Sequence, residues 1–401
     1  MADHSDKFDL LHPFRLHPHQ KAAGVSMRLE RQGVRHSEVY RRKGQFAGWP
    51  ANYGLWMWGN ETVVVFVAGI LGSEGPLHAR DRNHAFRPRQ ARSLDGGLTW
   101  AIEAFSGATP GGASLSADEH LNDPLRAGTN IAPGRELLIL DSPIDFFDPE
   151  TIVMAGRTGI RGNAISWFYV SRDRARTWAG PFGLGDMGLP GISARTDIVA
   201  LGRHDALFML TSTKSDGEEG RVFCARTEDG GRSFYVQAFL MAETAGYSIM
   251  PASVMRPDGA ILTLVRRMET TDTGWIDAFI SKDLGQSWRE IGEPIPTGCG
   301  GNPPAVTTLA DGRIVLVYGY RDRPYGIRCR TSRDGGVTWS AETIVRDDGG
   351  SPDLGYARIV VRRDGSILAV YYFNSRENPE RFIAASTFSA DAVTWRAHPR
   401  L

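Results

Sequence analysis

Arginines at the ends of short apolar runs are the residues of this sequence with the clearest potential for chemistry. Arg157, Arg266 and Arg321 occupy such positions, and Arg195 stands where a predicted strand begins. A planar guanidinium binds a carboxylate through two parallel hydrogen bonds, and several guanidiniums around one point repel each other unless an anion joins them. For one arginine alone, a local ion pair or a solvated surface position is the simpler interpretation. As a set, they favour an anion-binding centre, provided that the fold brings them together.

Two repeated patterns indicate which elements position these arginines. The first is Ser/Thr-x-Asp-x-Gly-x-Thr/Ser-Trp/Phe, and each copy is called a box below. The boxes span residues 93–100, 171–178, 227–234, 281–288 and 332–339, with a shortened copy at 389–395. In a tight turn, the Asp side chain accepts hydrogen bonds from backbone N–H groups, and Gly supplies a positive φ. Each box therefore predicts a hairpin turn with the aromatic residue packed beneath it.

The second pattern is a turn followed by a short apolar strand. Its copies span residues 59–66, 148–154, 203–210, 258–265, 311–318 and 364–371. Short apolar runs bounded by turn residues are typical of buried strands. The six turns alternate with the six boxes, so the repeating unit is a four-stranded antiparallel meander, the size of one propeller blade. The sequence predicts an all-β fold, with an N-terminal segment (1–44) and a six-bladed β-propeller (45–401).

The boxes resemble the Asp-boxes, or BNR repeats, of the sialidase (neuraminidase) superfamily, and the resemblance runs from about residue 45 to residue 395. It implies a propeller of four-stranded blades. Such boxes also occur in propellers that are not sialidases, and they lie away from the catalytic face. Because fold does not fix function, the site needs its own argument.

One face of the predicted propeller collects the residues that could do chemistry. In a meander blade, the start of strand 1, the end of strand 2 and the loop between strands 2 and 3 share the face opposite the two tight turns. The residues placed there are Trp49, Asn52, Arg157, Arg195, Asp197, Tyr247, Met250, Arg266, Arg267, Asn302, Arg321, Tyr356 and Tyr372. The longest loop of this kind, in the first blade, adds His78, Arg80, Asp81, Arg82 and His84.

The sialidase resemblance assigns catalytic roles to two of these residues. Sialidases use a Tyr nucleophile with a Glu beside it, and an Asp that serves as acid and base. Asp81, in the long first loop, is similar in position to that aspartate. Tyr356 stands in a segment that resembles the one around the sialidase tyrosine. The resemblance therefore implies Asp81 and Tyr356 as the catalytic residues.

The same resemblance implies arginines that hold the substrate carboxylate, of which sialidases have three. Arg266 or Arg267 resembles the second arginine, and Arg321 or Arg323 resembles the third. Together with the topological argument, this gives a set of predicted substrate-binding residues. They are Trp49, Arg157, Arg195, Asp197, Arg266, Arg267, Arg321 and Arg323.

Two departures from the sialidase pattern concern the same centre. The first arginine of the family lies in an Arg-Ile-Pro segment, but here the segment is Gly-Trp49-Pro. The glutamate beside the tyrosine should fall near residues 248–251, which contain no carboxylate. A tyrosine with a pKa of about 10 is a poor nucleophile at neutral pH without a base. By topology, Arg195 and Asp197 are the nearest substitutes, and the chain resembles a divergent member of the superfamily.

Three functions are compatible with these residues. The first is an exo-acting glycoside hydrolase on a terminal anionic sugar, which would retain configuration through a Tyr-linked intermediate. The second is a polysaccharide lyase on a uronic-acid polymer, with arginine neutralising the uronate and Tyr356 or a histidine moving protons. The third is a carbohydrate-binding propeller without catalysis, which the two departures favour.

Composition and charge limit the possible partners and the cellular location of the protein. The 46 Lys and Arg residues balance 46 Asp and Glu residues, so no overall field attracts nucleic acid or an anionic membrane. We expect a carbohydrate partner, no nucleic acid and no membrane, since no apolar run reaches about 18 residues. Three cysteines and no signal-peptide pattern favour the cytoplasm by default, with secretion by another route as the alternative. His12, His17 and His19 have no further ligand set near them, so we expect no metal or cofactor.

Overall fold

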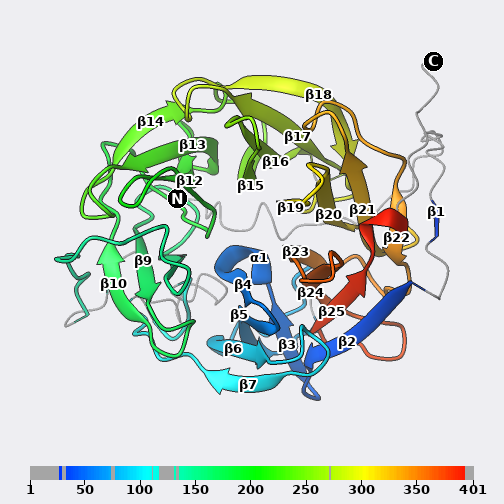
Figure 1. The fold of residues 1–401 in the computed structure, drawn as a ribbon. Coiled ribbons are helices and arrows are strands. Elements are labelled where there is room, and N and C mark those ends of the chain that lie inside the picture. Colours follow the sequence, from blue (N-terminus) through cyan, green and yellow to red (C-terminus); the bar gives the residue numbers. More distant parts are fainter. Residues whose placement is uncertain are drawn as a thin grey trace.

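The fold is a ring of six β-sheets around a central axis (Figure 1). The computed structural model describes residues 27–28, 33–73, 77–110, 112–116, 131, 135–270 and 272–392. Each sheet is built on an antiparallel meander and forms one blade of the ring. The predicted all-β, six-bladed propeller is therefore confirmed.

The strands follow one another around the ring in chain order. In the first three blades they are β3 (Gln45–Gly48), β4 (Gly54–Trp58), β5 (Glu61–Ile70), β6 (Arg87–Ser93), β7 (Ala101–Ala104), β8 (Ile152–Arg157), β9 (Ser166–Ser171), β10 (Ala179–Gly183), β11 (Ile198–Ala200), β12 (Ala206–Thr213), β13 (Glu219–Thr227) and β14 (Tyr235–Phe239). In the last three they are β15 (Tyr247–Met255), β16 (Ile261–Thr270), β17 (Thr273–Ser281), β18 (Arg289–Pro296), β19 (Ala305–Thr308), β20 (Ile314–Tyr320), β21 (Gly326–Ser332), β22 (Thr343–Arg346), β23 (Gly355–Val361), β24 (Ile367–Phe373), β25 (Phe382–Phe388) and β2 (Val34–Tyr40). The short β1 (Met27–Arg28) pairs in parallel with the outer strand β22.

The ring is closed by a strand from the N-terminal side. β2 pairs antiparallel with β25, with Val34 opposite Phe388 and Glu38 opposite Ala384. It is thus the outermost strand of the last blade, in the order β2-β25-β24-β23. Residues 34–40 fall in the segment predicted to precede the propeller, but the structure places them within its last blade.

The inner strand of the first blade is interrupted at the axis. β3 and β4 both pair with β5, and between them α1 (Pro50–Tyr53) turns into the middle of the ring (Figure 1). The residues on either side, Trp49 and Gly54, have φ values of 64° and 153°, which lie in the region that glycine adopts most readily. All four residues of α1 are buried, so this short helix is part of the core.

The second blade has three strands, β8 to β10, in the part of the chain that the structure describes. Two backbone N–H groups of β8 are bound by other segments. Arg157 N donates to Leu115 O at 3.1 Å, and Ala155 N donates to Thr196 Oγ1 at 2.9 Å. These two hydrogen bonds replace some of those that a fourth strand would form with β8 on the axial side of the blade.

Both faces of a blade are buried against its neighbours. On β5, the consecutive residues Val63, Val64, Val65 and Phe66 are each 0% exposed, although successive side chains of a strand point to opposite faces.

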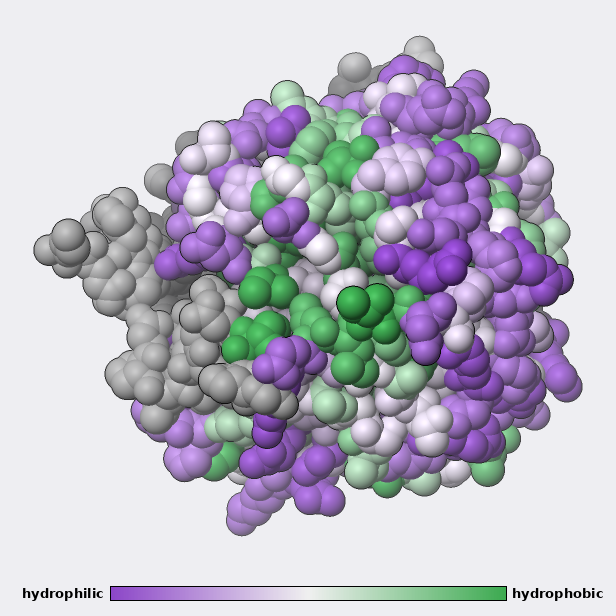
Figure 2. Space-filling model, turned by 90° about the vertical axis from the view of Figure 1, so that its left-hand side faces the viewer, coloured by the Kyte–Doolittle hydropathy of each residue, from purple (hydrophilic) through white to green (hydrophobic). Residues whose placement is uncertain are grey.

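Apolar surface is exposed on the outer side of the disc near β10, where Figure 2 shows hydrophobic groups among hydrophilic ones. Ile139, one residue after the bridge between Leu138 and Phe182, is 89% exposed.

The box turns have the hydrogen bonds expected from their sequence. In the fourth box, Ser287 N and Ser287 Oγ donate to the Asp283 carboxylate at 2.9 and 2.5 Å. Ser281 Oγ donates to the same carboxylate at 2.7 Å and accepts a hydrogen bond from Gly285 N at 2.8 Å. The same contacts recur in the boxes of Asp95, Asp173, Asp229 and Asp334. The hydrogen bond from Ser287 lowers the pKa of Asp283 below its ordinary value.

Replacing this carboxylate tests the role of the boxes. Asp283→Ala should lower the free energy of unfolding by about 1–2 kcal/mol, as expected for the loss of hydrogen bonds that cap a turn. Urea unfolding measures the change, and Lys282→Ala, at the exposed neighbouring position, should leave stability unchanged.

The contribution of Asp283 to the stability of the fold should decrease in acid. Because the pKa of Asp283 is depressed in the folded state, its contribution is present above the unfolded pKa of about 3.9 and is lost as the pH falls through the folded pKa. The difference between the wild type and Asp283→Ala should therefore shrink in acid. Equal stability of the two proteins at neutral pH would contradict the prediction.

Candidate functional site

Tyr356 lies at the point where blades four, five and six converge. It is the second residue of β23, and its φ of 52° is unusual for a bulky side chain. Arg266 Nη1 donates to Tyr356 Oη at 3.0 Å. The guanidinium carbons of Arg266 and Arg321 lie 5.6 and 5.8 Å from the centre of the Tyr356 ring. Three of the residues predicted for the central face thus form one cluster, which is called the tyrosine centre below.

Arg266 is held by uncharged partners. Its Nη2 donates to Tyr247 Oη at 2.8 Å and to Gly300 O at 2.6 Å. The side chain comes from the end of β16 and only 5% of the residue is exposed. Its Nε is buried without a hydrogen-bond partner. A buried guanidinium with spare donors has a strong electrostatic preference for a nearby anion.

Arg321 is bound in the same way from the next blade. Its Nη1 donates to Gly301 O at 2.9 Å, its Nη2 donates to Tyr372 Oη at 3.2 Å, and its Nε is buried without a partner. Only 1% of the residue is exposed. Within the described parts of the chain, no carboxylate oxygen lies within 4.0 Å of either Arg266 or Arg321. The tyrosine centre therefore contains two buried guanidiniums that no described carboxylate contacts directly, while the charge of Glu219 acts on Arg266 from a greater distance.

Arg195 differs because it has an acidic partner. Both of its Nη atoms donate to the carboxylate of Glu219, one of them at 3.3 Å, and its Nε donates to Asn52 Oδ1 at 3.2 Å. Burial opposes ionisation of Glu219, but the charges of Arg195 and Arg157 outweigh it and hold the pKa of that carboxyl below its usual value. Arg157, at the end of β8, is 2% exposed and donates to Ala194 O at 3.4 Å.

Glu219 was not among the predicted residues. It is the first residue of β13, directly after the loop between strands 2 and 3 of the third blade. The topological rule that placed the arginines on the central face also applies to this loop, so Glu219 could have been predicted from the sequence. The adjacent Gly220 packs against Tyr247, since a Cβ at this position would lie 3.0 Å from Tyr247 Cα.

The pKa values distinguish the three tyrosines of the cluster. Burial opposes ionisation of Tyr356, but the positive charges of Arg266, Arg321 and Arg195 outweigh it, so the pKa of its phenol lies below the ordinary value. Burial raises the pKa of Tyr247. Burial, together with the charge of a neighbouring aspartate, raises that of Tyr372 well above the ordinary value. Tyr356 is therefore the phenol of this cluster that ionises most readily.

The long loop of the first blade covers the tyrosine centre with His78. The imidazole lies edge to face with Tyr356, with ring centres 5.8 Å apart, and its Nδ1 accepts a hydrogen bond of 2.9 Å from Trp49 Nε1. The next residue anchors the loop, since Ala79 N donates to Asp353 Oδ2 at 2.9 Å. Burial lowers the pKa of His78 to about 3. His78 is thus neutral at physiological pH, with its ring hydrogen on Nε2 because Nδ1 is an acceptor.

Trp49 and Asp353 support this arrangement. The Trp49 ring packs against Phe46, Phe86 and Tyr372, so this predicted substrate-binding residue forms part of the wall. The Asp353 carboxylate is completely buried and accepts hydrogen bonds from Tyr372 Oη at 2.8 Å and Arg381 Nε at 2.7 Å. Asp353 stands three residues before Tyr356, but its long-range partners could not be read from the sequence.

Asp81 lies at the base of the long loop. Its carboxylate accepts hydrogen bonds of 2.8 Å from Asn83 N and from His84 Nδ1. The hydrogen bond from Asn83 N lowers the pKa of Asp81, and a quarter of its side chain is exposed. Its catalytic role remains a prediction.

The other predicted residues lie away from the tyrosine centre. Arg267 follows Arg266 on β16 and points to the other side of the strand, where it forms an ion pair of 3.0 Å with Asp277. Arg323 is exposed and lines a separate surface pocket of about 550 Å³ with Tyr325 and Arg376. Asp197 lines a pocket deeper along the axis, which is treated in the last section of these Results.

The structure indicates no metal centre or membrane span within its described residues. No group of three or more His, Cys, Asp or Glu side chains is placed to hold a metal ion in that part of the chain. His12, His17 and His19 lie outside the described residues. Of the helices described, none is long and apolar enough to cross a membrane.

Comparison with known families and sequences gives one match. The profile of the family described as BNR repeat-like domain matches residues 150–369. A search of curated protein sequences found no significant match.

Solved structures with the same fold include proteins of several kinds. A protein of unknown function from Dyadobacter fermentans is 22% identical, covers 89% of this chain and 99% of its own, and has a TM-score of 0.62. A Hadza microbial sialidase is 14% identical over 88% of this chain and 66% of its own, with a TM-score of 0.59. An α-L-arabinofuranosidase from Fusarium graminearum is 13% identical over 87% and 98%, with a TM-score of 0.53. At these identities the likeness establishes the fold alone.

The order of ionisation at the tyrosine centre can be measured. In a pH titration followed by phenolate absorbance, the difference between the wild type and Tyr356→Phe should show one tyrosine that ionises below the usual pKa of about 10. The neighbouring arginines are the cause. Tyr372→Phe is the matched control, because it removes a phenol whose pKa is raised. If both variants remove only a late-ionising phenol, the proposed effect of the arginines is wrong.

Proposed function

The chain belongs to the BNR repeat-like domain family, and from that premise we propose that it is a glycoside hydrolase acting on a terminal anionic sugar. One observation carries the proposal. Arg266 and Arg321 are 5% and 1% exposed, face the same phenol, and have no carboxylate partner within the described residues. A sugar carboxylate supplies the negative charge that this arrangement favours.

Tyr356 is the proposed nucleophile. The arginines that attract the substrate also stabilise a phenolate, which addresses the missing glutamate beside the tyrosine. With a lowered pKa, a larger fraction of the phenol has already released its proton to water when the substrate arrives, so a dedicated base is less necessary. Glu219 is occupied with Arg195 and contributes to the charge balance of the third blade.

The reaction then proceeds in two displacements. The Tyr356 oxygen forms a bond to the anomeric carbon while the bond from that carbon to the departing glycosidic oxygen breaks. The departing oxygen takes a proton from the acid, for which Asp81 is the residue that the sialidase resemblance implies. Because hydrogen bonds lower the pKa of Asp81 in the free protein, this role requires that the carboxylate takes up a proton from water when the substrate binds. Water then attacks the anomeric carbon and returns its proton to the same carboxylate as the bond to Tyr356 breaks. The products are the free sugar with retained configuration and the alcohol.

A lyase is the second candidate, and one contact favours it. The neutral imidazole of His78 lies against Tyr356, so two groups that could move protons stand beside the buried arginines. A lyase would remove the proton next to a uronate carboxylate and expel the glycosidic oxygen. Its unsaturated product absorbs in the near ultraviolet, whereas hydrolysis creates no such absorbance.

Removing the proposed nucleophile separates catalysis from binding. Tyr356→Phe should lower kcat on aryl glycosides of acidic sugars by roughly a thousandfold or more, the scale expected for a catalytic nucleophile. Binding of the free acidic sugar, measured by calorimetry, should change little. Tyr235→Phe, on the outer strand β14, controls for the loss of a phenol as such. Full activity of Tyr356→Phe would exclude the Tyr mechanism, and sugar binding without turnover in the wild type would indicate a binding protein.

The proposed acid has its own test. Asp81→Asn should slow substrates with poor leaving groups more than activated aryl glycosides, because only the poor leaving groups need a proton on the departing oxygen. The ratio of kcat/KM for an alkyl and an aryl glycoside measures this effect. Arg87→Ala is the control, because it removes an exposed side chain at the start of β6 and not one that hydrogen-bonds to Asp81. If the ratio is unchanged in Asp81→Asn, another group protonates the leaving oxygen.

A further inference from the structure

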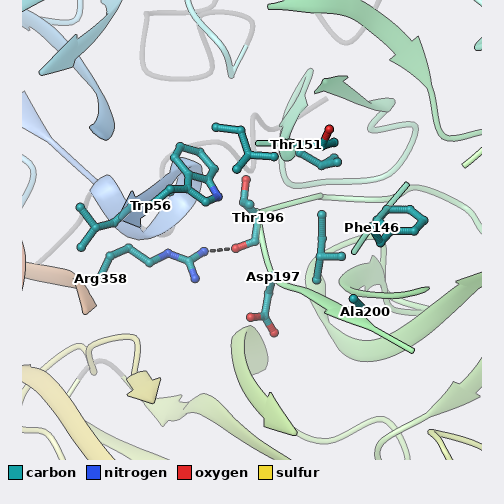
Figure 3. Close-up of a pocket in the computed structure, with 12 residues that line it drawn as sticks. Trp56, Phe146, Thr151, Thr196, Asp197, Ala200 and Arg358 are labelled. Atoms are coloured by element: carbon teal, nitrogen blue, oxygen red, sulfur yellow. Dashed lines mark hydrogen bonds between the residues drawn. The ribbon is translucent and has the colours of Figure 1, made fainter. Parts of the chain in front are cut away.

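A second pocket opens from the axis on the face of the hairpin turns, on the other side of α1 from the tyrosine centre. Its volume is about 260 Å³, and Figure 3 shows the side chains that line it. They come from four blades: Trp56 from β4, Thr151 from the turn before β8, Asp197 and Ala200 from the third blade, and Arg358 from β23. This space is called the lower pocket below.

Two residues of the lower pocket are close in sequence to residues of the tyrosine centre or its border. Arg358 stands two residues after Tyr356, and Asp197 stands two residues after Arg195. The ladder of β23 with β24 is irregular between Gly355 and Arg358, and β11 begins only at Ile198. In each pair the first residue belongs to the tyrosine centre or its border, while the second lines the lower pocket. Asp197, predicted to bind the substrate, therefore lines a different space.

Arg358 supplies hydrogen-bond donors to the lower pocket. Its Nη2 donates to Ala51 O at 2.8 Å and also to Thr196 O, and Figure 3 shows the guanidinium pointing toward Thr196. Its Nε is buried without a partner. In the described residues, no carboxylate oxygen lies within 4.0 Å of this guanidinium. Because a guanidinium has five N–H donors, the two carbonyl groups leave several of them for a ligand.

Asp197 supplies the complementary acceptors. Only 8% of the residue is exposed, and its carboxylate accepts hydrogen bonds from Ser253 Oγ at 2.7 Å and Ser253 N at 3.3 Å. A carboxylate has about four lone-pair positions, so acceptor capacity remains. Burial raises the pKa of Asp197 to about 6 against the opposing charge of Arg358, and the group is therefore ionised at slightly alkaline pH.

The remaining walls are mostly apolar and partly aromatic. Trp56 lies on the side of Arg358, while Phe146 and Ala200 lie on the side of Asp197 (Figure 3). The Trp56 ring packs over the backbone of Gly54 and lies 5.7 Å from the ring of Trp178. These contacts hold the indole in place at the edge of the pocket. An aromatic ring beside separate donors and acceptors suits a ligand that is apolar on one face and polar at its edge.

We propose that the lower pocket binds one neutral pyranose ring, with Trp56 against its C–H face and Arg358 and Asp197 on its hydroxyl groups. A hydroxyl both donates and accepts, so adjacent hydroxyls satisfy the guanidinium and the carboxylate together. An inorganic anion offers acceptors only and would be repelled by Asp197. The volume of about 260 Å³ has room for one such ring.

The test uses the methyl glycosides of glucose, galactose and mannose as probes, at slightly alkaline pH. At least one of them should bind saturably to the wild-type protein, with a Kd of about a millimolar, as measured by saturation-transfer NMR and by tryptophan fluorescence. Ala200→Phe places a ring in the pocket and should weaken that binding by about tenfold or more. Its hydrolytic activity at the tyrosine centre should stay unchanged. Arg358→Met should also lose the binding, but this residue supports α1, so Ala200→Phe is the decisive variant.

Three outcomes would overturn the proposal. The first is no saturable signal from any of the three neutral glycosides. The second is wild-type binding in Ala200→Phe together with a loss in Arg266→Met, which would place the sugar at the tyrosine centre. The third is tighter binding of methyl glucuronide than of methyl glucoside, lost in Ala200→Phe, which would show that Arg358 recruits an anion. None of these outcomes depends on whether the chain is a hydrolase.

Discussion

The pairing of β2 with β25 is the contact on which the rest of the ring depends. It joins the N-terminal side of the propeller to its last blade through a ladder from Val34 opposite Phe388 to Tyr40 opposite Ile383. Ser37 Oγ then donates to Gly97 O at 2.9 Å, in the box of the first blade. Without β2, β25 would present an unpaired edge, and blades one and six would lose this connection. The lower pocket combines Trp56 of the first blade with Arg358 of the last, and the tyrosine centre is covered by His78 of the first blade, so both require the closed ring.

A closed ring also concentrates charge. The inner strands converge at the axis, where long side chains from several blades must share a small space. Arg266 and Arg321 meet at Tyr356 with only neutral partners among the described residues, whereas Arg195 and Arg267 have Glu219 and Asp277. Two buried guanidiniums without acids are costly in the empty protein. The carboxylate of the proposed substrate would offset this cost, and without it the two guanidiniums lower the pKa of the phenol between them.

The sequence allowed the blades to be predicted because their turns are governed by local chemistry. A box such as that of Asp283 contains its own donors and acceptors within a few residues, so the pattern alone specifies the turn. The sialidase resemblance offered Arg266 or Arg267 as the second arginine but did not decide between them. Glu219 and Asp353 escaped prediction because their partners come from distant segments. The insertion of α1 between β3 and β4 is a tertiary effect, since a helix of four residues is not stable alone.

α1 is in contact with arginines that border both spaces along the axis. From the side of the tyrosine centre, Arg195 Nε donates to Asn52 Oδ1 at 3.2 Å. From the lower pocket, Arg358 Nη2 donates to Ala51 O at 2.8 Å. Adjacent residues of one short helix are therefore held by two arginines, each of which also faces a cavity or its border. Because the helix has too few residues to be rigid by itself, its position is set by these contacts.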